Sequence, residues 1–187
     1  SLIVVLAVVS LSLSMLQAPF GIFYQERFQL AEKTAAQHIG YVLAVVGAVS
    51  VIVQGFLIGR IAKLIGEKAA IVYGAVISAA AFMLIAAANS LVLIAVFAGI
   101  HAFGLAIITP GTLALISKRV KEEEQGAIMG ITHGAASSAR VVGPLLGGYM
   151  FDAAGIAWPL YTRPAIMVAA AIIALTKTNH LTNRSEP

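Results

Sequence analysis

The 187-residue chain is 60% hydrophobic and only 11% charged, carries a net charge of +4 and has no cysteine. An ordinary soluble domain is roughly 25% charged, so this composition indicates a membrane protein. Disulfides, thiolate metal sites and cysteine nucleophiles are excluded, and the basic residues form no extended face that could follow a nucleic acid backbone.

Long apolar runs, separated by short charged stretches, predict transmembrane helices. A bilayer core about 30 Å thick needs about 20 mostly apolar residues per helix, and the alternating pattern of a membrane barrel is absent. The expected fold is all-α and polytopic, with one membrane domain over residues 1–178 and a cytoplasmic tail over 179–187. Six helices are expected, at residues 2–24, 38–59, 69–88, 91–116, 126–150 and 157–175.

The first expected helix carries polar residues on one face, because Ser10, Ser14, Gln17, Gly21 and Tyr24 are spaced 4, 3, 4 and 3. Polar groups inside a membrane span are costly and point to a cavity or a partner helix. Gln17 and Tyr24 are therefore candidates for substrate binding, although single amides also join helices by hydrogen bonds.

The second expected helix contains the polar pair Ser50 and Gln54 and leads into a basic connection. The third is almost uniformly apolar, and so is the second half of the sixth. We therefore expect helices three and six to face lipid and helices one, two, four and five to lie inside.

The fourth expected helix has His101 near its middle. The fifth carries a second polar stripe, formed by His133, Ser137 and Arg140. Each histidine either carries protons near neutral pH or makes a neutral hydrogen bond between helices, and the second reading is the commoner one. Arg140 costs about 2.5–3.5 kcal/mol near mid-span, and no Asp or Glu lies within any expected span. It either binds backbone carbonyls and cavity water or serves transport.

Helix five also repeats small residues, which favour close approach of helix backbones in lipid. We interpret the stripe as a packing seam rather than a ligand site, and its proline permits bending. Its members are Gly126, Gly130, Gly134, Gly143, Pro144 and Gly147. Helix six is interrupted by Arg163 and Pro164; proline suits a first turn, and a long arginine side chain can snorkel outward.

The charged connections predict the sidedness of the chain. Basic residues concentrate after helices two, four and six, so by the positive-inside rule both chain ends are expected in the cytoplasm of a plasma or inner membrane. The chain begins inside an apolar run without an initiator Met or a basic leader region, so we expect it to be excised from a longer protein. We find no phosphate loop, metal-ligand cluster or paired nucleophile, and expect no enzyme activity, metal or cofactor.

Two stretches resemble the major facilitator superfamily. The segment from Gly59 and Arg60 to Gly66 and Lys68 is similar to the loop motif of the family's second half, with Lys63 where the fuller motif is acidic. The stretch from Pro110 to Gly148 resembles helices ten and eleven of the tetracycline-efflux-like drug/proton antiporters, and residues 19–28 resemble the seventh helix of that branch.

The resemblance implies that these six helices are helices seven to twelve of a twelve-helix fold. In that fold the substrate binds near the midplane, between two halves that rock. Gln17, Tyr24 and His101 then become cavity candidates, with Gln54, whereas His133, Ser137 and Arg140 lie near the seam between the halves. The expected partners are membrane lipid, a small-molecule substrate, protons and an N-terminal six-helix half that supplies the proton-binding carboxylate.

The function that follows is secondary active transport, as proton-coupled efflux of a small, amphiphilic organic compound. A facilitator or symporter for a sugar or organic acid is a second reading, which a strongly polar cavity would favour. A nontransporting membrane sensor with the same fold is a third.

Overall fold

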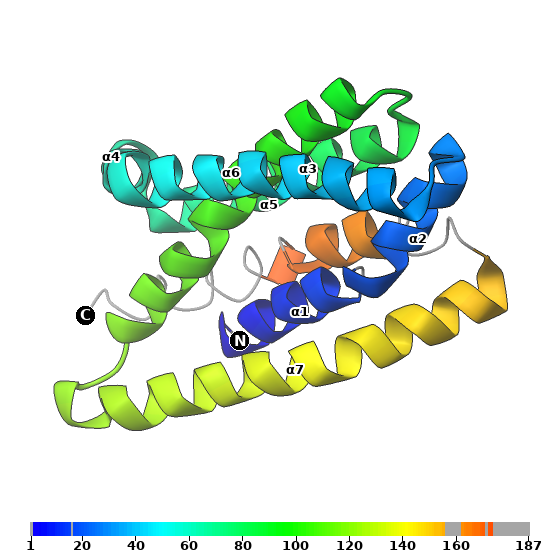
Figure 1. The fold of residues 1–187 in the computed structure, drawn as a ribbon. Helices are drawn as coiled ribbons and strands as arrows, with labels where there is room; N and C mark the ends of the chain where they lie inside the picture. The colour runs from blue at the N-terminus through cyan, green and yellow to red at the C-terminus, as the bar shows by residue number, and fades with distance from the viewer. Residues whose placement is uncertain (1, 16, 156–161, 171, 174–187) are drawn as a thin grey trace.

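A computed structural model describes residues 2–15, 17–155, 162–170 and 172–173, and the described part contains helices and no strand. The expectation of an all-α fold is confirmed. Figure 1 shows α3 and α7 on opposite sides of the molecule, with α1 between them. The elements are α1 (Leu2–Ser14), α2 (Gln17–Phe28), α3 (Glu32–Ile52), the π-helical η1 (Val53–Leu57), α4 (Ile58–Ile65), α5 (Glu67–Ala87), α6 (Leu91–Ser117), the 3-10 turn η2 (Glu122–Glu124) and α7 (Gln125–Ala154).

The first predicted helix, 2–24, is wrong as a single element, because the structure has two helices there. α1 ends at Ser14, Met15 lies in a turn, and α2 begins at Gln17. Position 19 is a proline, which has no N–H to offer the carbonyl of residue 15 and disfavours a continuous helix through that carbonyl. The break lies four residues before the proline, as this reasoning requires.

The second predicted helix is longer than expected. Residues Glu32–Ile65 form one continuous helical segment of 34 residues, through α3, η1 and α4. Glu32 lies in the first turn, where a carboxylate is favoured by the helix dipole. The segment ends at Gly66, whose φ of 79° suits glycine, and α5 starts directly after it.

α5 and α6 pack together at two glycines, Gly74 and Gly104. A Cβ on Gly74 would lie 2.9 Å from the carbonyl oxygen of Gly104, and a Cβ on Gly104 would lie 2.9 Å from Ser78 Cβ. Small residues permit such close approach of backbones, which matters in lipid because apolar side chains gain little from meeting each other there.

The prediction that helix three only faces lipid is wrong for one side of α5. That side is buried and includes Ser78 and Phe82, whereas Tyr73, Val76 and Met83 on the other side are exposed. Uniform apolarity could not reveal this division, since lipid and a membrane protein interior accept the same side chains.

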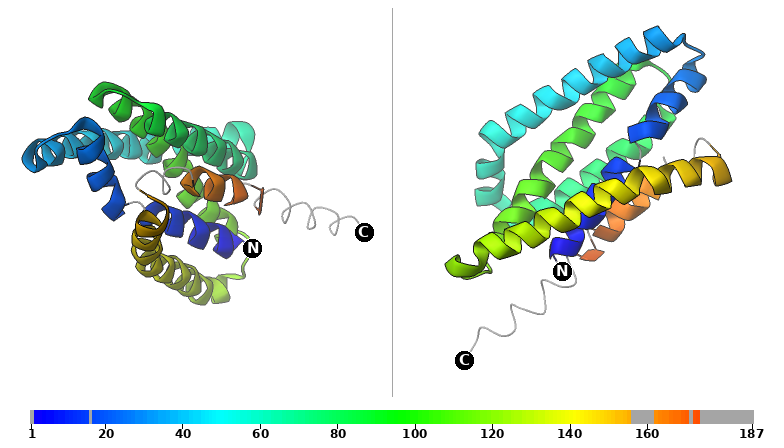
Figure 2. Two further views of the ribbon diagram at one scale, coloured as in Figure 1. Left: turned by 90° about the vertical axis from the view of Figure 1, so that its right-hand side faces the viewer. Right: turned by 60° about the horizontal axis from the view of Figure 1, so that its bottom comes forward.

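The sixth predicted helix is described at 162–170 and 172–173, and its other residues lie outside the described part of the chain. Met167 and Ala170 are buried in a cluster with Val5 and Val9 of α1 and with Ile71 of α5. This places the stretch against α1 and α5 (orange in Figure 2), with one face turned inward. Its prediction as a purely lipid-facing helix is therefore also wrong for that face.

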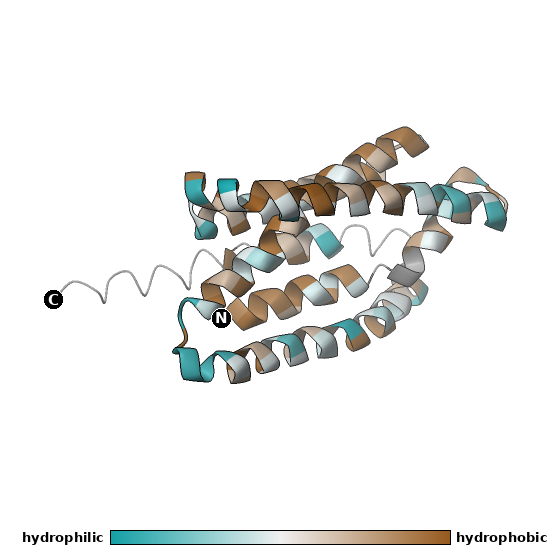
Figure 3. Cartoon of the chain, turned by 60° about the vertical axis from the view of Figure 1, so that its left-hand side comes forward, coloured by the Kyte–Doolittle hydropathy of each residue, from teal (hydrophilic) through white to brown (hydrophobic). Residues whose placement is uncertain are grey.

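Three helical segments in the described part are long and apolar enough to cross a membrane: Glu32–Ile65, Glu67–Ala87 and Leu91–Ser117. α7 has 30 residues but carries more polar side chains. Hydrophilic residues gather at the connections, while the middles of α3, α5 and α6 are hydrophobic (Figure 3). α3, η1 and α7 expose many large apolar side chains, among them Leu43, Phe56, Val141 and Leu145.

Candidate functional site

A cavity of about 410 Å³ opens in the middle of the molecule. Its walls come from α1, α2, α3, α5, α6, α7 and the stretch 162–170, so nearly every described helix contributes. Most of the wall is apolar, with a few polar groups set into it. The polar residues are Ser14, Ser50, His101, Arg140 and Arg163.

Three of the helices around the cavity meet in a buried hydrogen-bonded chain, Ser78–His101–Arg163. His101 Nδ1 lies 2.8 Å from Ser78 Oγ and 2.9 Å from the Ser78 carbonyl oxygen. His101 Nε2 lies 2.8 Å from a terminal nitrogen of Arg163. Ser78 is 0%, His101 7% and Arg163 8% exposed, so α5, α6 and the last described helix are joined inside the protein.

The chemistry of these partners decides the tautomer of His101. A guanidinium group only donates hydrogen bonds, so Nε2 must offer its lone pair to Arg163. Nδ1 then carries the proton and donates it to the carbonyl oxygen of Ser78, with Ser78 Oγ beside it. His101 is therefore a neutral hydrogen-bonding residue in this arrangement, the commoner of the two roles expected for it.

Phe82 also contacts Arg163. The guanidinium carbon lies 4.3 Å from the centre of the Phe82 ring, a cation–π contact, and the His101 ring lies 5.3 Å from the same ring. The prediction that Arg163 snorkels outward is wrong, because this aromatic face and the His101 acceptor hold it inside. Its Nε is buried and has no hydrogen-bond partner among the described residues.

The other predicted cavity and seam residues are scattered. Arg140 lines the cavity, as His101 does, but is exposed on α7. Gln54 lies in η1 and is exposed, and His133 and Ser137 are exposed on α7; none of these three lines the cavity. The side chain of Gln17 lies outside the described part of the structure.

Tyr24 lies in the packed interior rather than in the cavity wall. It is 1% exposed, contacts the rings of Phe20 and Phe28, and its hydroxyl lies 3.0 Å from His38 Nδ1. This bond ties α2 to the start of α3. The predicted stripe from Ser10 to Tyr24 does not exist as one face, since the chain breaks between α1 and α2.

Replacing Tyr24 with phenylalanine is expected to lower the free energy of unfolding by about 1 kcal/mol, because it removes one hydrogen bond and keeps the ring. Thermal unfolding of the detergent-solubilised protein measures this. Substrate affinity is expected to stay unchanged, since Tyr24 does not line the cavity. A loss of affinity at unchanged stability would place the hydroxyl in the binding site instead.

The predicted glycine seam divides into two parts. A Cβ on Gly143 or Gly147 would collide with Ser14 Oγ or the Met15 carbonyl oxygen, so these glycines seat α7 against the end of α1. Gly126, Gly130 and Gly134 have no described residue of another helix within 4 Å of their Cβ positions. Pro144 lies inside α7, which continues through it.

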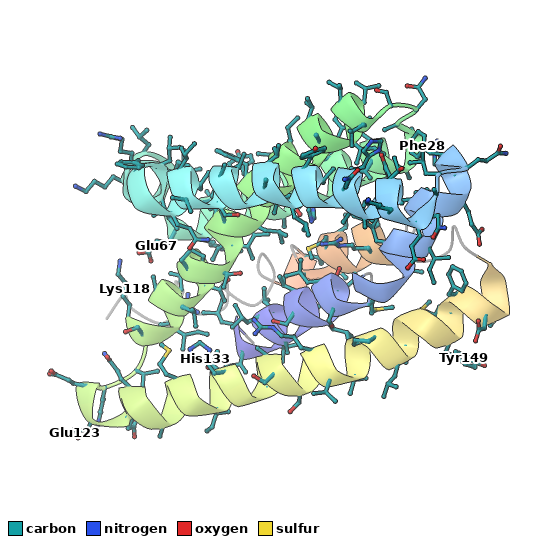
Figure 4. All side chains as sticks on the ribbon, in the orientation of Figure 1. Phe28, Glu67, Lys118, Glu123, His133 and Tyr149 are labelled. Carbon is teal, nitrogen blue, oxygen red and sulfur yellow. The ribbon has the colours of Figure 1, made fainter. Side chains whose placement is uncertain are left out.

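The predicted loop motif surrounds the α4–α5 junction. Gly59 and Arg60 are exposed, and an Arg60 terminal nitrogen donates to the Phe56 carbonyl oxygen at 3.0 Å. Gly66 provides the turn, and Lys68 lies in the first turn of α5. Beside them, Glu67 and Lys118 form an ion pair of 2.6 Å that links the start of α5 to the end of α6 (Figure 4).

Sequence reasoning missed Ser78, Phe82 and the inward position of Arg163. One signal was present, because an arginine within an apolar run is costly to place in lipid and needs compensation. Arg163 needs such compensation because it is buried, whereas Arg140, for which we expected it, is exposed. No comparable signal marked Ser78 within the apolar α5.

Comparison with known proteins agrees with this architecture. The family model described as Major Facilitator Superfamily matches residues 2–187. The chain belongs to the major facilitator superfamily. As a family member with long apolar helices it is an integral membrane protein, and the resemblance noted in its sequence is confirmed.

Several relatives are named as resistance proteins, transporters or solute carriers. The chain is 29% identical over 144 residues to the tetracycline resistance protein, class C, of Escherichia coli, covering 73% of this chain and 33% of the relative. It is 26% identical over 114 residues to the multidrug transporter protein MdtP of Bacillus subtilis (strain 168), covering 61% and 21%. It is also 23% identical to mouse solute carrier family 22 member 18, covering 89% and 40%.

A solved major facilitator structure has the same fold. The human organic anion transporter MFSD10 (TETRAN) matches with a TM-score of 0.80 and 21% identity, over 92% of this chain and 39% of that chain. This chain therefore has the fold of one half of a major facilitator protein. It spans between 21% and 40% of the length of the three relatives named above.

Proposed function

We propose that this chain is the C-terminal half of a secondary active transporter that exports a small, amphiphilic organic compound by alternating access. The observation that carries the proposal is the cavity of about 410 Å³, whose mostly apolar wall contains a few fixed polar groups. Such a wall suits a compound with an apolar body and one polar end. Relatives that include a tetracycline resistance protein and a multidrug transporter favour export over uptake.

The partner that completes the transporter is an N-terminal six-helix half. α3 and α7 form the seam with that half in this proposal, because both expose long apolar faces in this chain. The open Cβ positions of Gly126, Gly130 and Gly134 leave room for a close helix from that half. His133 and Ser137 are exposed on α7, Gln54 is exposed in η1 directly after α3, and all three would lie in or beside that contact.

Proton coupling requires a titratable group that releases its proton when substrate binds. His101 offers no vacant nitrogen, because Arg163 and Ser78 occupy both. We propose that the coupling carboxylate belongs to the N-terminal half, that the protein lies in a plasma or inner membrane, and that both ends of this chain face the cytoplasm.

A facilitator or symporter for a sugar or organic acid is the second candidate. The wall has five polar residues against ten apolar ones, which disfavours a sugar, since sugars need many hydrogen-bonding groups. A nontransporting sensor is the third candidate. The open cavity, with polar side chains in its wall, argues against it.

Proteoliposomes that contain the complete protein test this proposal. An imposed pH gradient is expected to drive accumulation of an amphiphilic dye, and a protonophore that abolishes the gradient is expected to abolish it. Liposomes without protein are the control for passive partitioning. Equal dye distribution with and without the gradient would contradict proton-coupled transport.

A further inference from the structure

The charge of the cavity is positive and has no described counter-charge. Arg140 and Arg163 both line it, and no Asp or Glu is among the lining residues that the structure describes. The acidic residues of the whole chain are Glu26, Glu32, Glu67, Glu122, Glu123, Glu124, Asp152 and Glu186, all in connections, at helix ends or in the tail. A buried cation without an anion is costly, and none of the described residues supplies the counter-charge.

The partners of Arg163 do not supply it. His101 accepts a hydrogen bond from one of the five N–H groups of the guanidinium. It is neutral while it does so, because its Nδ1–H donates to Ser78. Phe82 offers the face of its ring. The buried Nε makes no hydrogen bond to any described residue. Arg163 is thus fixed in direction, and no described residue neutralises its charge.

Fixing a donor in this way prepares it for an anion. The hydrogen bonds to Ser78 orient the His101 imidazole, and the imidazole accepts a hydrogen bond from one edge of the Arg163 guanidinium. The Phe82 ring packs against the guanidinium. A planar guanidinium with donors remaining is the group that proteins use for carboxylates and related anions. Arg140, which also lines the cavity, adds a second positive charge to it.

The remainder of the wall restricts the anion further. Apolar side chains from several helices line the same cavity, among them Leu13, Phe20, Val42 and Leu105. An inorganic anion would leave this surface uncovered. We infer that Arg163, set by His101 and Phe82, is the anion-binding subsite of the cavity and that the transported compound is an amphiphilic organic anion, such as an aryl carboxylate or sulfonate.

This inference rests on the proposed transport function and specifies its substrate class. A carboxylate side chain from the N-terminal half would offer Arg163 the same chemistry. In that case the cavity would be neutral overall and would not distinguish an anion from an uncharged compound of the same shape. The two sources are therefore separated by the charge preference of the complete protein.

Three probes of one shape measure that preference: 2-naphthoate, 2-naphthamide and protonated 2-naphthylmethylamine. Their binding to the purified complete protein is followed by ligand-dependent thermal unfolding. We expect 2-naphthoate to bind about tenfold or more tightly than the other two, the factor that a charge-assisted hydrogen bond provides. Equal binding of naphthoate and naphthamide, preference for the cation, or no binding of any probe would overturn the inference.

Variants identify the residue responsible. Arg163→Gln is expected to weaken naphthoate binding about tenfold or more and to leave naphthamide binding unchanged. Arg163→Lys is expected to keep a reduced preference for naphthoate over naphthamide. It keeps the positive charge but loses the paired N–H donors of the guanidinium. Arg119→Gln, an exposed arginine outside the cavity, is the matched control. Should Arg163→Gln fail to fold, the preference of the unmodified protein and of Arg163→Lys still decides the question.

Transport of the same probes separates this inference from the proposed function. Arg163-dependent binding of naphthoate without any movement across proteoliposomes would contradict transport and support the anion subsite. Movement of naphthamide or of the cation, with naphthoate excluded, would support transport and overturn the anion subsite.

Discussion

Replacing Gly104 with alanine is expected to lower the free energy of unfolding by about 2–3 kcal/mol, the cost of overpacking a tight contact. The added Cβ would collide with the Gly74 carbonyl oxygen and would lie 2.9 Å from Ser78 Cβ and 3.0 Å from Ser78 N. Two of these atoms belong to the backbone of α5, so no side-chain rotation relieves the contact. The helices must separate, and the adjacent Ser78–His101 bonds lengthen with them.

Gly40→Ala is the matched control for this experiment. A Cβ at Gly40 meets nothing within 4 Å in this chain, so the substitution changes only helix propensity, which favours alanine by about 0.5–1 kcal/mol. Thermal unfolding of both variants of the complete protein, in one detergent, provides the comparison. Equal stability of the two variants would mean that α5 and α6 are not in contact at Gly104.

Single substitutions in the His101–Arg163 pair are expected to cost about 1.5–3 kcal/mol each, the range for hydrogen bonds to charged groups. His101→Leu leaves the Arg163 guanidinium buried without its acceptor, and Arg163→Met leaves His101 Nε2 without its donor. The double variant removes both groups together. Its cost is expected to fall below the sum of the single costs by about 1–2 kcal/mol.

The double-mutant cycle is measured from the unfolding free energies of the four proteins. Thr132→Val combined with Arg163→Met serves as the control cycle, since the Thr132 hydroxyl bonds only the Ile128 carbonyl oxygen of its own helix. That pair is expected to be additive. Additive costs for His101 and Arg163 as well, within about 0.5 kcal/mol, would mean that the 2.8 Å contact between them carries no energy.

The described helices agree with the sequence prediction where length and apolarity alone define them. The predicted spans 69–88, 91–116 and 126–150 correspond to Glu67–Ala87, Leu91–Ser117 and Gln125–Ala154. An uninterrupted apolar run sets the boundaries of the first two, because charged residues have to leave the hydrocarbon core, whereas α7 contains Arg140 and His133 within its span. The break before Pro19 was also readable, yet the polar spacing from Ser10 to Tyr24 suggested one continuous face.

The candidate site was less predictable, because helix orientation decides it. Hydropathy says how apolar a helix is, and in lipid it does not say which face turns inward. His101 was found because it is polar in mid-span, and the cavity contains it. Arg163 and Ser78 were assigned to helices expected to face lipid, and only the packing of α5, α6 and 162–170 brings them to His101.

The transport proposal requires that the cavity lined by His101 and Arg163 is open to water, while the outer face of α5 lies in lipid. The present chain has no cysteine, so single cysteines at Ser50, in the cavity wall, and at Ala80, on the exposed side of α5, report the two environments. They are introduced into the complete protein, freed of other cysteines, in open membranes. A charged maleimide is expected to label Ser50→Cys rapidly and Ala80→Cys very slowly, since thiolates form only in contact with water. Labelling of Ala80→Cys with Ser50→Cys protected would contradict the account.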